Sequence, residues 1–160
     1  WGEYPETEER FGSVLGRNQA YIKMTVAKPD KSCFVSFYQH IRRFRIYGQD
    51  GKLKRDVILD LFPGQECPEV DDNMRLIHPI CVYTTDNYIY TLNLDMTTED
   101  VEDRKTTPNI QVFDWEGKPL IQYKLDCFIN TFAVDEVAHK IYGVFVEDED
   151  HIYVFNLPQL

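Results

Sequence analysis

The chain has 160 residues, a formal net charge of −10, and 43% hydrophobic and 14% aromatic residues. This length and apolar content suit one folded domain and exclude a disordered chain. No apolar run approaches the ~18 residues of a membrane-spanning helix, no signal peptide is visible at the start, and the negative charge argues against nucleic acid as the main partner.

Residue usage favours strands over helices. Ala occurs only 4 times, whereas Val, Ile, Thr, Tyr and Phe together number 55. β-branched and aromatic side chains fit a pleated surface, and Ala is the best helix former. The composition therefore predicts an all-β protein.

The first segment, residues 1–19, is polar and interrupted by glycine and proline. Gly2, Pro5, Gly12 and Gly16 break any regular pattern in it. We expect a loop here, with at most one helical turn. An N-terminal Trp1 suggests that the chain is excised from a longer protein.

Three segments after this point repeat an alternation of period two. They align Phe44 with Ile110 and Ile152, and Ile46 with Val112 and Val154; Tyr47, Phe113 and Phe155 form a third column. This alternation is typical of half-buried strands. The first two segments end in an acidic residue followed by Gly-Lys, at Gly51 and Gly117, where glycine supplies the positive φ of a tight turn.

A hairpin precedes each of these segments, so the copies begin near Ala20, Leu76 and Phe128. About four strands per ~50 residues is the pattern of propeller blades. We therefore predict a partial β-propeller of three antiparallel blades, at about 20–62, 76–126 and 128–158, with eleven strands in all. The third blade lacks its outer strand, which in closed propellers commonly comes from the other end of the chain. The alternative is a β-sandwich or barrel, whose strands also recur at short intervals.

Two stretches carry a family resemblance. The entry to the first blade contains Gly2, Tyr4-Pro5 and Ala20-Tyr21, and the last blade contains Phe132-Ala133-Val134-Asp135 and Asp150-His151-Ile152-Tyr153-Val154-Phe155. This pattern resembles the TolB-like six-bladed propellers. The resemblance implies the C-terminal half of a six-bladed ring, from an exported and often lipid-anchored protein of Gram-negative bacteria. It supplies no catalytic residues.

This fold predicts a non-catalytic binding scaffold that presents loops to a protein, peptide or glycan. The alternative is part of a metal-dependent propeller hydrolase or lactonase whose site is shared with the missing half. A purely structural oligomerisation module is a third hypothesis.

Two residues are candidates for ligand contact. His78 lies in an inner strand, where a propeller directs side chains to its central channel, and Asn130 has a comparable place in the third blade. No motif for catalysis, a nucleotide or a cofactor is present. The acidic stretch Glu147–Asp150 lacks the spacing and glycine of a calcium loop, and a solvated turn is expected there.

Charge is unevenly distributed. Residues 17–55 hold 10 basic and 2 acidic side chains, whereas residues 56–160 hold 6 basic and 21 acidic ones. Opposite charges on the two open faces, together with unpaired strand edges, predict a homodimer. The basic-aromatic stretch around Arg43 and Arg45 is expected to be a solvated strand face. Three of the four cysteines, Cys33, Cys81 and Cys127, are expected to be free buried thiols. The alternative is one disulfide, whose pairing the sequence does not determine.

Overall fold

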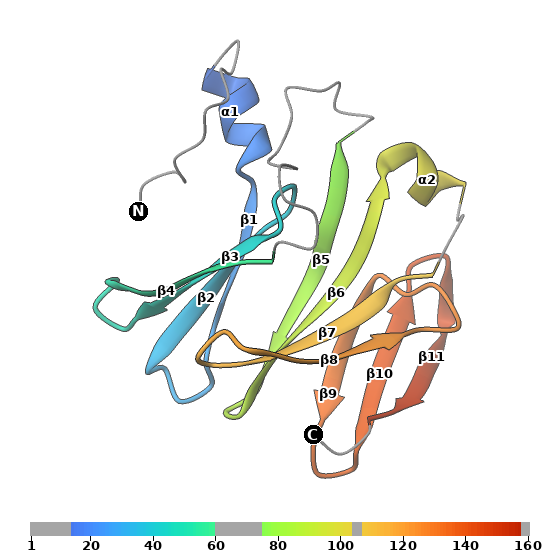
Figure 1. The fold of residues 1–160 in the computed structure, drawn as a ribbon. Helices are drawn as coiled ribbons and strands as arrows, with labels where there is room; N and C mark the ends of the chain where they lie inside the picture. Colours follow the sequence, from blue (N-terminus) through green and yellow to red (C-terminus); the bar gives the residue numbers. More distant parts are fainter. Residues whose placement is uncertain (1–13, 60–74, 104–106, 158–160) are drawn as a thin grey trace.

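The computed structural model describes residues 14–59, 75–103 and 107–157 (Figure 1). Most of the 1–19 segment and the acidic stretch 63–73, which contains Cys67, lie outside the described residues. Within the described ranges, no helix combines the length and apolar character needed to cross a membrane.

The strands form three separate antiparallel sheets, and within each sheet neighbouring strands follow chain order. The first sheet consists of β1 (Lys23–Ala27), β2 (Cys33–Tyr38), β3 (Arg43–Gly48) and β4 (Leu53–Ile58). The second consists of β5 (Leu76–Thr84), β6 (Tyr88–Thr97), β7 (Asn109–Asp114) and β8 (Pro119–Lys124). The third has only β9 (Thr131–Asp135), β10 (Lys140–Phe145) and β11 (Asp148–Asn156).

This arrangement confirms the predicted partial propeller. The three sheets follow one another in Figure 1, and the first strand of the second sheet, β5, contacts the first strands of both neighbours, β1 and β9. A sandwich would instead place two sheets face to face. Among the described residues, the third sheet has no fourth strand beyond β11, as the shortened third repeat predicts.

Two short helices depart from the expected loops. Helix α1 (Val14–Ala20) occupies the end of the 1–19 segment, and α2 (Thr98–Glu102) follows β6. The Thr97 side chain caps α2 by accepting a hydrogen bond from the Asp100 backbone N–H, and the acidic Glu99 and Asp100 lie in its first turn. Both features stabilise a helix N-terminus, so the local sequence explains α2.

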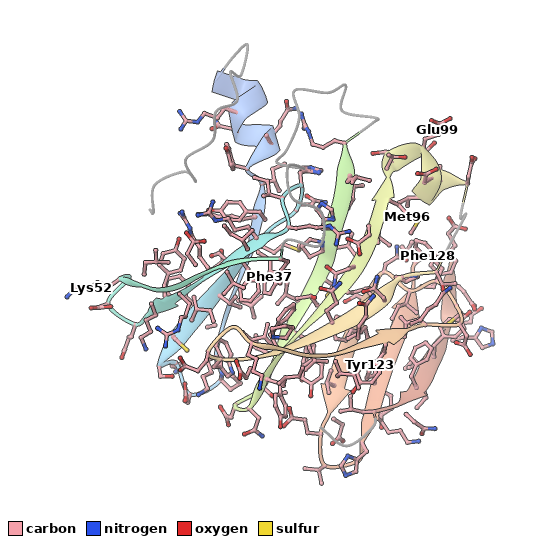
Figure 2. All side chains as sticks on the ribbon, in the orientation of Figure 1. Phe37, Lys52, Met96, Glu99, Tyr123 and Phe128 are labelled. Atoms are coloured by element: carbon pink, nitrogen blue, oxygen red, sulfur yellow. The ribbon has the colours of Figure 1, made fainter. Side chains whose placement is uncertain are left out.

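A continuous apolar core joins the second and third sheets. Tyr90, Leu92 and Val112 are fully buried on the second sheet, and they pack against Ile129, which precedes β9, and Ile141 of β10. Tyr123 contributes to the same core from β8 (Figure 2). Aliphatic and aromatic side chains, which are common in protein cores, therefore fill this part of the interface.

Glycines with positive φ form the two Gly-Lys turns. Gly51 between β3 and β4 has φ 78°, and Gly117 between β7 and β8 has φ 85°. A Cβ atom at Gly117 would lie 2.5 Å from Cγ2 of Val57, whereas a Cβ atom at Gly51 would meet nothing within 4 Å. The Gly117 turn is therefore packed against β4, and the Gly51 turn is open.

Candidate functional site: a cleft between the first and second sheets

The interface between the first and second sheets is apolar at one end only. There Phe37 stacks on Phe44 with ring centroids 4.4 Å apart, and Phe44 lies 4.9 Å from Phe113. Ile89 completes this part of the core. Figure 2 shows Phe37 where the first sheet faces the second.

Farther along the same face of the second sheet, the side chains become polar. Alternation puts Thr91 and Asn93 on the face of β6 that also carries Ile89. On β7, Gln111 shares the face of Phe113 and pairs in register with Thr91 on one side and Gln122 of β8 on the other. Asn93 is 5% exposed, and its amide donates hydrogen bonds to the Thr91 carbonyl oxygen (3.1 Å) and to Thr91 Oγ1 (2.7 Å).

A cleft of about 450 Å³ occupies this end of the interface. Three aliphatic side chains line it from the outer part of the two sheets: Val57 and Leu59, which are half-buried, and Leu120, which is 38% exposed. Ile58 and Ile121 border the cleft, but alternation turns their side chains to the opposite faces of the sheets, because they pair in register with Arg43 and Val112. Deeper lining comes from apolar and polar residues of both sheets, among them Phe37, Phe113, Arg42, Arg43, His78, Asn93, Asp95, Gln111 and Gln122.

A charged triplet lies at the polar end of the cleft. Asp95 Oδ1 accepts a hydrogen bond from His78 Nδ1 at 2.8 Å and lies 3.2 Å from Arg42 Nη2. Burial would raise the pKa of Asp95, but the hydrogen bond from His78 and the charge of Arg42 outweigh it and hold this pKa below its ordinary value. Asp95 has φ 55°, a conformation that Asp tolerates better than most residues.

The triplet also fixes the two sheets to each other. Arg42 precedes β3 of the first sheet, whereas His78 and Asp95 belong to β5 and β6 of the second. The His78 backbone N–H donates to the Gln39 carbonyl oxygen at 2.8 Å, and His40 Nδ1 lies 2.9 Å from the Leu76 carbonyl oxygen. Because Asp95 occupies Nδ1 of His78, a ligand in the cleft meets this ring through Nε2 or its carbon edge.

The basic strand face around Arg43 and Arg45 is not solvated as expected. Arg45 is only 8% exposed, and both guanidinium groups bind Asp56 of β4, at 2.6 Å for Arg43 and 3.0 Å for Arg45. Burial would raise the pKa of Asp56, but the two arginines hold it below its ordinary value. The alternation of the strand correctly placed the two arginines on one face. It could not reveal that Asp56 lies opposite them, in register with Arg45, and binds both.

The structure separates the two predicted site residues. His78 is 6% exposed and lines the cleft between the first two sheets. Asn130 lies next to β9 in the third sheet, where its Oδ1 accepts a hydrogen bond from the Val146 backbone N–H at 2.9 Å and closes the chain reversal after β10. Sequence reasoning did not identify Asp95, Arg42, Gln111 or Gln122. The sequence contained one signal for this part of the site. Polar residues occur on β6 and β7 at positions where the period-two alternation predicts buried side chains.

The acidic stretch is partly strand. The turn falls at 146–147, and β11 already begins at Asp148, whose carboxylate binds His151 Nδ1 and the Tyr153 hydroxyl, each at 2.6 Å. Across the described part of the chain, no group of three or more His, Cys, Asp or Glu side chains is placed to hold a metal ion. Cys33, Cys81 and Cys127 are free thiols; Cys33 is buried, and the other two are half-buried.

Comparisons with known proteins agree with this fold. The model of the family described as TolB-like 6-blade propeller-like matches residues 80–137, which span most of the second sheet and β9. The resemblance inferred from the sequence is thereby confirmed over this range. No curated protein matches the sequence significantly.

Two solved structures align with most of the chain. The structure of the RRP9 WD40 repeats aligns with a TM-score of 0.53 and 14% sequence identity, covering 83% of this chain and 34% of that one. A complex of KlAtg21 with the coiled coil of AgAtg16 aligns at a TM-score of 0.42 and 10% identity, covering 84% of this chain and 41% of that one. The chain thus spans about a third of the length of the WD40 propeller that it matches.

Proposed function

We propose that this chain is part of a non-catalytic β-propeller scaffold that binds a partner in the cleft between its first and second sheets. The observation that carries the proposal is the lining of this cleft of about 450 Å³, where aliphatic side chains of both sheets meet polar groups that include His78, Gln111 and Asp95. A hollow of about 440 Å³ between the second and third sheets is lined mainly by polar turn residues and has fewer apolar side chains.

The cleft has the composition of a binding site. Ligand pockets are usually concave and mostly apolar, with a few polar groups that orient the ligand. Both walls are strands of hydrogen-bonded sheets, and the polar end is fixed by the Arg42–Asp95–His78 contacts. A preformed site of this kind loses little conformational entropy on binding.

A photo-crosslinking amino acid at Leu120 tests this function in cells that make the protein. Leu120 lies on the cleft wall, and Val137, 94% exposed in the turn between β9 and β10, provides the control position. We expect a discrete crosslinked product from Leu120 that is absent from Val137 and is lost when Gln122→Ala is added. No product at Leu120, or the same product at both positions, would contradict the proposal.

We also propose that the open edge and exposed face of the third sheet support a homodimer. β11 is the edge strand of that sheet, and Tyr142, Ile152 and Val154 are 37%, 66% and 55% exposed. The charge attraction expected from the sequence contributes little, because Arg43 and Arg45 already bind Asp56. Light scattering at tens of micromolar tests the dimer, and a monomer would contradict it.

Export to the periplasm or outer membrane is a further proposal, supported by the TolB-like match, because that family is typically periplasmic. A six-bladed ring in a bacterial lipoprotein would follow from the same match. Fractionation of cells that make the full protein tests the location, and cytoplasmic recovery would contradict it.

A further inference from the structure

We infer that the cleft binds an extended, uncharged peptide segment through a branched aliphatic side chain, with the peptide groups held by Gln111 and Gln122. This inference rests on the proposed function and specifies the chemistry of its ligand. Four features of the described residues carry it: the aliphatic walls, the amide pair, the neutralised charges and the free strand edges.

Aliphatic side chains form the accessible walls of the cleft. Val57 of β4 and Leu59 just after it line the first wall, and Leu120 of β8 lines the second. Val57 and Leu59 are half-buried and Leu120 is 38% exposed, so each leaves apolar surface in water that a ligand can cover. An aliphatic side chain inserted between the two outer strands removes these surfaces from water.

Gln111 and Gln122 supply the polar contacts. They are paired in register on β7 and β8, and both line the cleft. A glutamine amide both donates and accepts hydrogen bonds, which matches the alternating N–H and C=O groups of a peptide. Gln111 is oriented in turn by Asn109, whose Oδ1 accepts from its Nε2 at 3.3 Å.

The charges in the lining are already neutralised. Arg42 pairs with Asp95, and Arg43 holds Asp56 through two hydrogen bonds of 2.6 Å. A charged anchor would have to lose its own hydration and compete with these pairs. The complementary ligand is therefore uncharged where it enters the cleft.

The aromatic lining does not suit a glycan. Sugars bind on exposed ring faces, but Phe37, Tyr38 and Phe113 are only 3%, 2% and 1% exposed. Phe37 and Phe113 are turned toward each other with centroids 6.0 Å apart. The surfaces left for a ligand are aliphatic, which favours a peptide over a carbohydrate.

Free strand edges border the cleft on both sides. Within the part of the chain that the structure describes, β4 and β8 are the last strands of their sheets, and one edge of each pairs with no described strand. Extended peptides commonly bind by adding to such an edge, with side chains entering neighbouring pockets. The cleft thus offers backbone pairing and a side-chain pocket together.

A displayed library of random nonapeptides, selected against the full chain, tests the inference. We expect enriched sequences with Leu, Ile or Val flanked by uncharged residues, and about tenfold weaker binding to the Leu120→Ser and Gln122→Ala variants. Both substitutions are at exposed positions, so the fold should persist. Lys124→Ala, on the same strand and outside the cleft lining, and Ile152→Ser, on the third sheet, are the matched controls and should bind like wild type.

The outcomes separate this inference from the proposed function. Enriched peptides with charged anchors whose binding still depends on Leu120 would overturn the peptide chemistry and leave the cleft as the site. Binding of an arrayed glycan that is lost in Gln122→Ala would do the same. Peptides that lose affinity only in Ile152→Ser, or a selection that yields no binder, would overturn both.

Discussion

Gly117 and Gly51 occupy equivalent turns but differ in their surroundings. Both have positive φ, which costs an L-residue roughly 1–2 kcal/mol, but only Gly117 lies against another sheet, at Val57. The turn also carries Glu116, which pairs with Arg55 of β4. A single methyl group therefore has different consequences at the two positions.

We predict that Gly117→Ala lowers the free energy of unfolding by more than Gly51→Ala does. Gly51→Ala should cost about 1–2 kcal/mol through backbone strain alone, and overpacking against Val57 should add about 1–3 kcal/mol at Gly117. Urea denaturation of both variants provides the comparison. Equal losses would show that the Gly117 turn does not pack on the first sheet.

Asp95 connects both sheets at the cleft, and its effect on stability should depend on pH. Its pKa in the folded protein is below the ordinary value of 3.8. A lowered carboxyl pKa stabilises the fold above the unfolded value, and this contribution is lost as pH falls from 3.8 through the folded pKa.

Asparagine tolerates the positive φ of position 95 as aspartate does. We predict that Asp95→Asn lowers the free energy of unfolding by about 1.5–3 kcal/mol at pH 7. The difference from wild type should shrink as the pH falls below 3.8, and thermal unfolding from pH 7 to 3 measures it. Asp86→Asn, at an exposed turn, is the control and should change stability by at most ~0.5 kcal/mol. A difference that does not vary with pH would contradict the ion-pair account.

Among the secondary-structure elements, residues in turns form hydrogen bonds that hold neighbouring sheets together. Glu136, after β9, accepts hydrogen bonds from Thr85 Oγ1 at 2.6 Å, from Asn87 Nδ2 at 3.0 Å and from the buried Tyr90 hydroxyl at 3.1 Å. Burial and the neighbouring Glu136 carboxylate raise the pKa of Tyr90, so the phenol stays a donor. One carboxylate thereby holds a turn and a strand of the second sheet to the third.

We predict that Glu136→Ala costs about 1–3 kcal/mol, because it leaves the Tyr90 hydroxyl buried without its acceptor. In a Tyr90→Phe background, where that hydroxyl is gone, the same substitution should cost less. A double-mutant cycle by chemical denaturation measures the coupling. Additive losses would mean that the Tyr90 contact contributes nothing to stability.

The strands themselves were predictable from the sequence, but their ends were less so. The period-two pattern correctly placed β2 and β3, because alternation and the flanking turn residues both mark them. β6 continues to Thr97, since Leu94 and Met96 extend its buried face. The helix α2 that follows lies inside the second repeat, where the period-two pattern contains no signal for a helix.

At the scale of the whole molecule, the repeats predicted the three sheets and the missing outer strand. They could not predict the cleft, because its presence depends on how completely the side chains of two neighbouring sheets fill the space between them. His78 was identified as a candidate from its inner strand, but its partner Asp95 lies 17 residues later and Arg42 lies in another sheet. Such a triplet has no spacing that a sequence pattern can reveal.

The molecule has two exposed apolar surfaces, and we propose only one of them as the peptide site. The cleft combines Val57, Leu59 and Leu120 with paired amides, whereas the exposed face of the third sheet carries Ile152 and Val154. The two surfaces lie on different sheets, so a ligand's position distinguishes them directly.

Methyl NMR of the full chain titrated with a selected aliphatic nonapeptide is the most direct test of the central claim. The account predicts saturable shifts of the Val57, Leu59 and Leu120 methyl resonances, with those of Ile152 and Val154 unchanged. Shifts confined to Ile152 and Val154, or no shift at the three cleft residues under saturating peptide, would contradict a peptide-binding cleft between the first and second sheets.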